Sequence, residues 1–80
     1  MLTPRQLRAA RAIIGWSRER LAEACRVPAV TIGEFETGKT DPKMSTVQKM
    51  RRAMERAGVD FLDATAEAGP GVRLRGERKQ

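Results

Sequence analysis

Along the first part of the chain, apolar residues recur every three or four positions, which is the period of an amphipathic helix. They are Leu7, Ala10 and Ile14, with Ile13 beside them. Ahead of them, Thr3 and Gln6 have the spacing of a capping box, and Pro4 suits the first helical position. Gly15 favours a left-handed helix end. The pattern therefore predicts a helix from residue 4 to about residue 14.

Two short helices are predicted next, separated by a break. Ser17 can cap the first of them, over residues 18–25. Pro28 disfavours helical angles in the residue before it, so this helix ends before the proline. A second short helix is expected over about residues 29–37, followed by Gly38. Two such helices can lock at a steep angle, which leaves the second one on the surface.

The helix expected over residues 29–37 has only two strong core anchors, Ile32 and Phe35. Its opposite side holds small, apolar or acidic residues: Ala29, Val30, Gly33 and Glu34. An ordinary four-helix core with Val30 buried is the alternative. Because Val30 lies roughly 160° from Ile32 around the helix axis, the spacing favours an exposed Val30.

A fourth helix has the cleanest separation of apolar and charged positions. Ser45 and Gln48 have the spacing of a second capping box. The apolar side holds Val47, Met50, Ala53, Met54 and Ala57. Gly58 sits just past the expected end of this helix.

The pattern changes from helical to strand-like after the fourth helix. Residues 59–63 and 72–75 alternate apolar and polar positions around a segment with Gly69, Pro70 and Gly71, which predicts a β-hairpin. We expect a mainly α fold of four to five helices with this C-terminal hairpin. The expected organisation is a helical domain over residues 1–58, a hairpin extension over residues 59–75 and a disordered tail over residues 76–80.

The composition excludes several classes of function. The chain has 80 residues, no histidine and one cysteine, so a His-based catalytic dyad, a zinc cluster and an internal disulfide are all excluded. We therefore expect a non-enzymatic protein without a cofactor. No apolar run approaches the roughly 20 residues that span a bilayer, and no secretion signal is visible, which predicts no membrane partner and a cytoplasmic location.

The charge is basic and unevenly distributed. Sixteen Lys and Arg against ten Asp and Glu give a net charge of +6, which suits nucleic acid but also an acidic protein. Residues 1–26 hold six Arg against two Glu, and residues 43–58 hold five Lys or Arg against one Glu. Residues 27–42 hold one Lys against three acidic residues. The flanks would then supply affinity and the centre selectivity.

The spacing of several motifs resembles the Cro/phage-repressor (Xre-type) helix-turn-helix family over about residues 2–62. The motifs are Leu7-Arg8-Ala9-Ala10-Arg11 with Gly15-Trp16-Ser17, Leu21-Ala22-Glu23, Val27 with Thr31-Ile32, Phe35-Glu36-Thr37-Gly38-Lys39, and Pro42. The ending over residues 59–62 and 71–75 is similar to that of a subgroup of small bacterial members. The resemblance implies a lambda-repressor-like helix-turn-helix domain and a DNA-binding transcriptional regulator or repressor.

The resemblance also implies roles for individual positions. The residues that would face base edges in double-stranded DNA are Ala29, Val30 and Glu34. Those that would contact the DNA backbone are Ser17, Arg18, Thr31, Thr37, Lys39, Thr40 and Lys43. Ala29 and Val30 could pack on thymine methyl groups, and Glu34 could accept a hydrogen bond from cytosine N4. Glu36 is implied to be structural.

Four departures from the family pattern affect these expectations. Arg26 stands where relatives commonly have glycine at the end of a helix, and a left-handed conformation there would cost about 1–2 kcal/mol. Arg18 stands where relatives often have glutamine. Gly33 lies inside a helix, at a cost of about 1 kcal/mol against alanine. Two outward positions of the reading helix are also apolar rather than polar.

Members of this family dimerise so that two reading helices enter major grooves about 34 Å apart on a palindromic site. The predicted dimer interface is the hairpin, through Phe61, Leu62, Val72 and Leu74. The alternative function is a protein-interaction module, an antitoxin or antiactivator, that binds a regulatory protein partner. Trp16 and Phe61 are expected to be core or interface aromatics, and Cys25 is expected to be buried packing.

Overall fold

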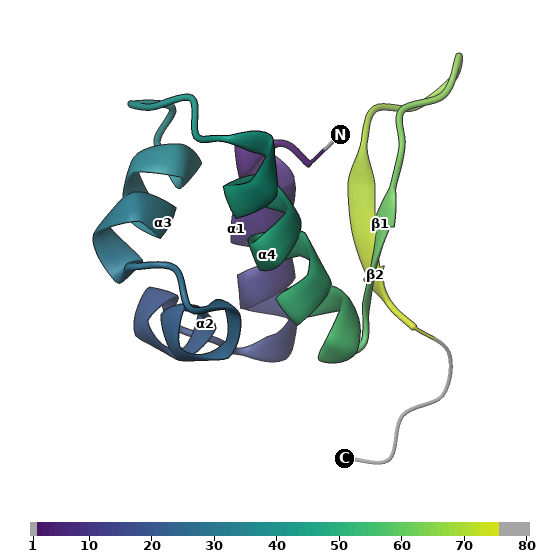
Figure 1. Cartoon of the computed structure of the whole chain (residues 1–80). Helices are drawn as coiled ribbons and strands as arrows, with labels where there is room; N and C mark the ends of the chain where they lie inside the picture. Colours follow the sequence, from purple (N-terminus) through teal and green to yellow (C-terminus); the bar gives the residue numbers. More distant parts are fainter. Residues whose placement is uncertain (1, 76–80) are drawn as a thin grey trace.

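The computed structural model describes residues 2–75 and contains four helices followed by a two-stranded hairpin (Figure 1). The elements are α1 (Pro4–Ile14), α2 (Arg18–Cys25), α3 (Ala29–Glu36), α4 (Met44–Arg56), β1 (Val59–Leu62) and β2 (Gly71–Leu74). The mainly α fold with a C-terminal hairpin is thus confirmed. Residues 76–80, expected to form a tail, lie outside the described residues.

The first two helices begin and end as the sequence predicts. The Thr3 hydroxyl accepts a hydrogen bond from the Gln6 N–H (3.1 Å), and the Gln6 side chain accepts one from the Thr3 N–H (3.0 Å). Gly15 ends α1 in the left-handed region, with φ 71°. Ser17 caps α2 by accepting from the N–H of Arg20 (3.0 Å). Local side-chain chemistry therefore fixes both helix starts.

The predicted capping box of Ser45 and Gln48 is wrong. Helix α4 begins at Met44, and no side chain caps it. The main-chain carbonyl of Lys43 already accepts the N–H groups of Thr46 and Val47. Ser45 consequently lies inside the first turn, where its hydroxyl cannot take the position of a helix cap.

One apolar core joins all six elements. Its largest fully buried apolar side chains are Leu7, Leu21, Ile32, Met50, Met54 and Val59. Cys25 is also buried, as expected, and burial raises the pKa of its thiol. Trp16 is half-buried against this core, with the Arg20 guanidinium 4.4 Å from its ring centre.

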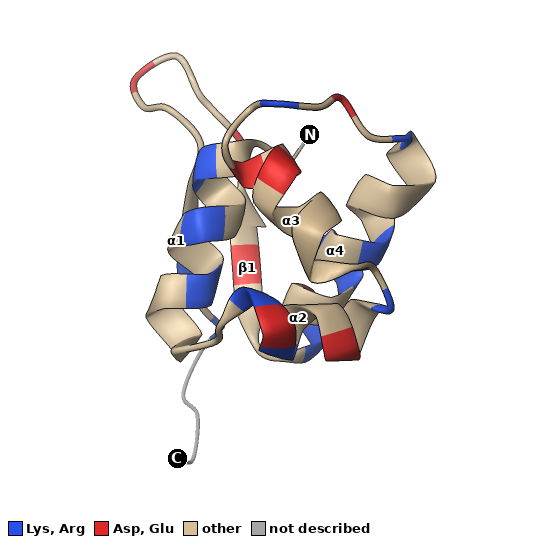
Figure 2. Cartoon of the chain, turned by 90° about the vertical axis from the view of Figure 1, so that its left-hand side faces the viewer, with Lys and Arg blue, Asp and Glu red and all other residues tan. Residues whose placement is uncertain are grey.

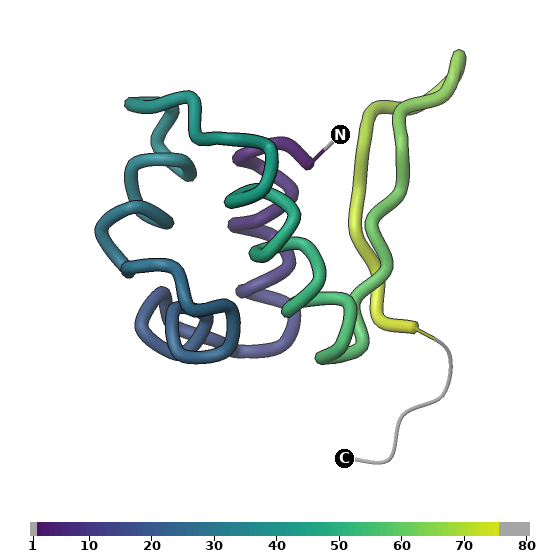
Figure 3. Tube along the Cα trace, in the orientation of Figure 1, coloured from purple at the N-terminus to yellow at the C-terminus, as the bar shows by residue number. Residues whose placement is uncertain are grey.

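The hairpin packs on α1 and α4, on the side of the helices opposite α3, as the trace in Figure 3 also shows. Its strands are antiparallel, with Val59 opposite Leu74 and Phe61 opposite Val72. Val59 and Phe61 are buried in the core, and the Arg51 guanidinium lies 5.3 Å from the Phe61 ring centre. The structure thus places Phe61 in the core of its own chain, which is one of the two positions that the sequence suggested for it.

Gln6 joins the hairpin to the start of α1. Its amide nitrogen donates to the main-chain carbonyls of Leu62 and Gly71, each at 3.0 Å. Gln6 is buried, and the same side chain completes the capping box of α1. Because a buried amide needs hydrogen-bond partners, this one residue couples the start of α1 to both strands.

On the outer face of the hairpin, Asp60 forms an ion pair with Arg75 (2.9 Å) and a longer one with Arg73 (3.5 Å). The hydrogen bond from Arg75 is the main reason why the pKa of Asp60 is lowered.

None of the described helices is long and apolar enough to cross a membrane.

Arg26 ends α2 in the left-handed region, with φ 61° and ψ 36°. Its N–H donates to the carbonyl of Ala22 (2.8 Å), so the strained conformation closes the last turn. Arg26 is the single described non-glycine residue with positive φ. The departure noted in the sequence therefore carries a real conformational cost.

We predict that Arg26→Gly raises the free energy of unfolding by about 1 kcal/mol, because glycine adopts the left-handed conformation without strain. Urea unfolding followed by circular dichroism would measure it. The control is Glu23→Gly inside α2, which should lower the same quantity by about 1 kcal/mol. A destabilised Arg26→Gly protein would show that the arginine side chain supports the turn.

Candidate nucleic-acid interface

Helices α2 and α3 and the turn between them present α3 on the surface. Ile32 and Phe35 bury one side of α3, whereas Val30 on the other side is 67% exposed. The alternative of an ordinary core with Val30 buried is therefore wrong. Gly38, with φ 76°, ends the segment after Glu36, and the chain then turns into an exposed loop. In Figure 2, α3 faces the viewer between α1 and α4.

The predicted base-reading residues lie together on this exposed side. Ala29 and Glu34 are half-exposed, and Val30 is the most exposed large apolar residue described. A shallow hollow of about 300 Å³ runs along them. Its lining consists of Arg18, Ala29, Val30, Gly33, Glu34, Thr37 and Lys39. Three predicted base contacts and three predicted backbone contacts thus share one surface.

Of the remaining predicted backbone contacts, Thr31 lies within α3 and the others lie at the start of α2 and in the loop after α3. Ser17 is exposed at the start of α2, and Thr31 is half-buried in α3. Lys39, Thr40 and Lys43 are exposed in the loop after α3. Figure 2 shows the loop's basic positions beside α3, with an acidic position between them. Hydroxyl and ammonium groups at these two ends are suited to phosphate oxygens on either side of a DNA groove.

Thr37 is exposed, but its hydroxyl already donates to the main-chain carbonyl of Gly33 (2.9 Å). This bond satisfies a carbonyl in the last turn of α3. The oxygen of the hydroxyl keeps acceptor capacity only, so the predicted phosphate contact of Thr37 would need this internal bond to break.

The strongest electrostatic feature beneath the surface is the buried carboxylate of Glu36. Arg11 binds it with two nitrogens, at 2.7 and 2.8 Å, and Arg18 donates from Nε at 3.0 Å. Arg11 also donates to the carbonyl of Trp16 (2.9 Å), and Arg8 donates to the main-chain carbonyl of Glu36. Three helices are thus tied to one fully buried side chain.

The ionisation of Glu36 follows from these contacts. Burial alone would raise the pKa of the carboxyl group, but the hydrogen bonds and positive charges of Arg11 and Arg18 hold that pKa below its ordinary value. The same hydrogen bond raises the pKa of Arg11. Glu36 is therefore a charged structural group at neutral pH, as the family resemblance implies.

Sequence reasoning missed the contact between Arg18 and Glu36. It placed Arg18 at the start of α2 as a phosphate contact, but the structure turns this side chain towards α3 and leaves it 42% exposed in the hollow. The signal in the sequence was the glycine at position 33. A β-carbon there would lie 3.2 Å from Nη1 of Arg18, so a side chain at position 33 would crowd the arginine.

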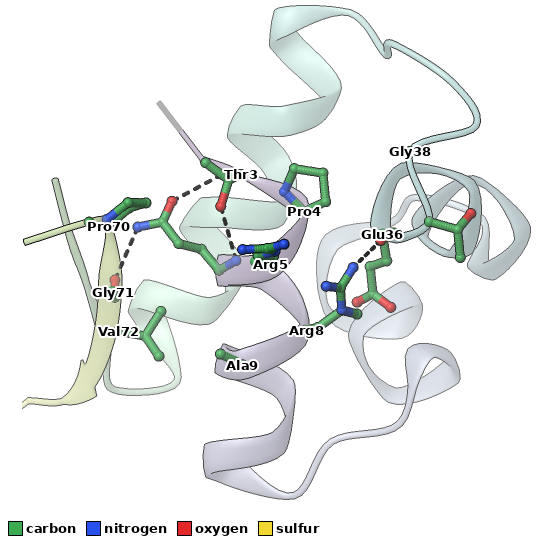
Figure 4. A pocket seen from close by; sticks show the side chains of 13 residues that line it. Thr3, Pro4, Arg5, Arg8, Ala9, Glu36, Gly38, Pro70, Gly71 and Val72 are labelled. Atoms are coloured by element: carbon green, nitrogen blue, oxygen red, sulfur yellow. Dashed lines mark hydrogen bonds between the residues drawn. The ribbon is translucent and has the colours of Figure 1, made fainter. Parts of the chain in front are cut away.

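A second, larger groove of about 690 Å³ lies between the start of α1, the end of α3 and the hairpin loop (Figure 4). Figure 4 shows Arg8 reaching across it to Glu36. The polar groups of Gln6 and Arg8 there are engaged in internal hydrogen bonds. Within residues 2–75, no group of three His, Cys, Asp or Glu side chains could hold a metal ion.

Here α2 and α3 meet at a steep angle, which leaves α3 on the surface with hydroxyl and basic side chains near both of its ends. This is the geometry of a helix-turn-helix DNA-binding domain. The helix-turn-helix family model HTH_3 matches residues 7–60, more than half of the chain. The chain therefore belongs to the Cro/C1-type, Xre-like helix-turn-helix family.

Members of this family are DNA-binding regulators and are typically non-enzymatic, and this chain is a DNA-binding regulator of that general kind. A search of the curated proteins finds no match.

We predict that Glu36→Gln lowers the free energy of unfolding by about 3 kcal/mol, because it leaves two arginines without their buried counter-charge. Denaturant unfolding at neutral pH would measure the loss. Glu34→Gln, two residues earlier and outside any ion pair in the described part of the chain, is the matched control and should change stability by less than about 0.5 kcal/mol.

The stability difference between wild type and Glu36→Gln should also depend on pH. The pKa of Glu36 is lower in the folded state than its ordinary value of 4.5, so its contribution is fully present above that pH. The contribution is lost as the pH falls through the folded pKa. The stability difference between wild type and Glu36→Gln should therefore shrink on acidification below about pH 4.5. A difference that stays constant down to pH 2 would contradict the charge-pairing explanation.

Proposed function

We propose that this chain is a sequence-specific transcriptional regulator that binds a palindromic operator as a homodimer, with α3 in the major groove. The observation that carries the proposal is the exposed side of α3, flanked at both ends by hydroxyl and basic groups. No other described helix of the chain presents an apolar residue as large and as exposed as Val30.

In this proposal the base contacts are Ala29, Val30 and Glu34. Methyl groups of Ala29 and Val30 pack on thymine C5-methyl groups, and the Glu34 carboxylate accepts a hydrogen bond from cytosine N4. Glu34 is repelled by phosphate when it is out of register, so it also acts against wrong sequences. The operator half-site then contains thymine near Ala29 and Val30 and cytosine near Glu34.

Affinity comes from the flanks of the reading helix. Ser17 at the start of α2 and Lys39, Thr40 and Lys43 after α3 contact phosphates, with Thr31 assisting through its hydroxyl. Helix starts favour anions because their first N–H groups lack helical partners. These contacts position the protein, whereas α3 selects the sequence.

The hairpin offers a route to the dimer through the outer edge of β2. Arg75 donates its N–H to the carbonyl of Gly58 (2.7 Å). In the alternating antiparallel pattern, the N–H groups of Val72 and Leu74 then point away from β1. No described strand pairs with this edge. A second copy could therefore add its own β2 in antiparallel register and form a four-stranded sheet.

The position of the hairpin relative to α3 supports this edge-to-edge arrangement. The hairpin and α3 lie on opposite sides of the molecule (Figure 1). A two-fold axis perpendicular to the sheet keeps both α3 helices on the same side, whereas stacking the sheets face to face would point them apart. The chain measures 33 × 31 × 19 Å, so two copies side by side along either of the two longer dimensions would lie about one 34 Å groove spacing apart.

Apolar side chains lie close to the same edge. Leu74 is 40% exposed and Leu62 is 36% exposed. Helix α1 and β2 run in the same direction (Figure 1), and Gln6 contacts Gly71. Ile13 is about 10 Å further along α1 and Leu74 about 10 Å further along β2, so they lie at one level. Phe61 packs beneath this proposed interface in the core, and Val72 contributes its main-chain N–H, which points away from β1.

A protein-binding function remains the second candidate, because an apolar Val30 beside Glu34 would also suit a groove on another protein. The experiment that separates the two is selection from sheared genomic DNA by the purified protein, followed by salt titration on the best fragment. A shared palindrome, with log affinity falling steeply against log salt, supports the operator proposal. Equal weak retention of all fragments would favour the protein partner.

Glu34→Ala should remove the base preference at one position of each half-site, by roughly 5- to 100-fold, while leaving the overall affinity for other positions intact. Selection and sequencing with the variant would measure the preference. Glu23→Ala, on the exposed side of α2, is the control and should reproduce the wild-type motif. An unchanged motif in Glu34→Ala would remove Glu34 from the reading surface.

Leu74→Pro should convert the dimer to a monomer. Proline removes the N–H of residue 74, which points to the free edge, and leaves the hydrogen bonds between β1 and β2 in place. Light scattering over a concentration series would measure the mass. Leu74→Thr keeps the N–H and the strand preference, so this control should remain dimeric. Deletion of the hairpin is a poorer test because Val59 and Phe61 belong to the core. A dimeric Leu74→Pro protein would place the interface elsewhere.

A further inference from the structure

Gly33 occupies the interior of α3 without a conformational reason to be glycine. The described glycines with positive φ are Gly15, Gly38 and Gly58, and Gly33 is not one of them. Glycine weakens a helix relative to alanine. Something other than backbone geometry must therefore benefit from the missing side chain at this position.

The guanidinium group of Arg18 lies directly against the space that a β-carbon would fill at position 33. A β-carbon there would lie 3.2 Å from Nη1, 3.4 Å from Cζ and 3.6 Å from Nε of Arg18. Three atoms of one planar group at nearly equal distances mean that the plane lies flat over Gly33. The glycine thus forms a seat for the arginine on the exposed side of α3.

The orientation of Arg18 within its plane is also fixed. Its Nε donates to Oε1 of Glu36 at 3.0 Å, and Glu36 is fully buried and held from the other side by Arg11. Because Nε is used, the two terminal amino groups are the part of the guanidinium left for another partner. In the described part of the chain the structure gives these groups no hydrogen bond, and the side chain is 42% exposed.

We propose that Arg18 is a specificity-determining residue that reads guanine in the major groove, rather than a phosphate contact. The inference rests on the proposed DNA-binding function. Arginine recognises guanine by donating two hydrogen bonds to O6 and N7. Arg18 lines the same hollow as Ala29, Val30 and Glu34, so its donors lie among the base-reading side chains.

The positive Arg18 and the negative Glu34 in the hollow together suit a guanine–cytosine base pair. Arg18 supplies donors for guanine, and Glu34 supplies an acceptor for cytosine N4. Both side chains line the hollow along α3. The selected half-site therefore contains a guanine contacted by Arg18 at, or next to, the base pair whose cytosine is contacted by Glu34.

Glu36 and Gly33 act here as positioning residues. A free arginine side chain loses much rotational freedom when it binds a base, whereas one already held by a buried carboxylate and a flat seat loses less. The rigid guanidinium then rejects bases that present no pair of acceptors at that place. The buried ion pair and the helix glycine thereby serve recognition as well as folding.

The test is selection from a randomised DNA library with the full-length protein and its Arg18→Lys variant, followed by affinity measurements on single-base substitutions. Lysine keeps the positive charge that a phosphate contact needs but loses the planar fork. We expect the preference for guanine at one position per half-site to fall by about 5- to 100-fold, with other positions unchanged. Lys39→Ala, a proposed phosphate contact, should instead weaken all sequences alike.

A variant that keeps Arg18 tests the seat itself. Gly33→Ala puts a methyl group 3.2 Å from Nη1, so the guanidinium must shift by a few tenths of an ångström. Alanine also favours the helix more than glycine does. The same guanine preference should fall in this variant. Thermal unfolding would verify that both variants are folded, since Arg11 still pairs with Glu36.

The outcomes separate this inference from the proposed function. A wild-type motif that survives unchanged in Arg18→Lys and in Gly33→Ala, with uniformly weaker binding, overturns the guanine assignment and leaves the operator proposal standing. A wild-type protein that selects no shared motif overturns both. Loss of the guanine preference at a single position in both variants supports the assignment.

Discussion

The buried carboxylate of Glu36 is the group on which the arrangement of the first three helices depends. A charge with no solvent exposure is tolerated only when partners replace its water, and here Arg11 of α1 and Arg18 of α2 do so. Arg8 adds a bond to the Glu36 main chain. Because guanidinium groups bind carboxylates directionally, these contacts fix how α3 lies against α1 and α2, beyond what apolar packing alone would specify.

The same network reaches the surface that we propose to contact DNA. Arg18 belongs to the ion pair and to the hollow along α3, so the core and the exposed side of α3 share a side chain. Glycine at position 33 makes α3 less stable than alanine would, but it leaves room for the Arg18 side chain. A local rule of helix formation is broken where a partner from another helix needs the space, which is typical of functional surfaces.

The hairpin solves a different problem on the opposite side of the molecule (Figure 1). Four short helices in 80 residues bury a small core, and Val59 and Phe61 enlarge it. Gln6 ties both strands to the start of α1. Because α3 and the free edge of β2 lie on opposite sides, the proposed assembly through that edge leaves the proposed DNA-binding side uncovered.

The sequence by itself determined the features that depend on near neighbours in the chain. The spacing of Leu7 and Ala10, the capping box of Thr3 and Gln6, and the glycine at position 15 predicted α1, and alternation predicted the hairpin. The start of α4 was misplaced because a main-chain carbonyl, that of Lys43, took the place of a side-chain cap. Exposure of Val30 followed from helical periodicity.

Only the tertiary structure decided which distant residues meet. It buried Phe61, turned Arg18 from the flank towards α3, and placed its guanidinium over Gly33. The contacts of Arg18 with Gly33 and Glu36 join residues 15 or more positions apart, so no local pattern encodes them. They depend on the angle between helices, which the packed core and the directional ion pair of Glu36 set together.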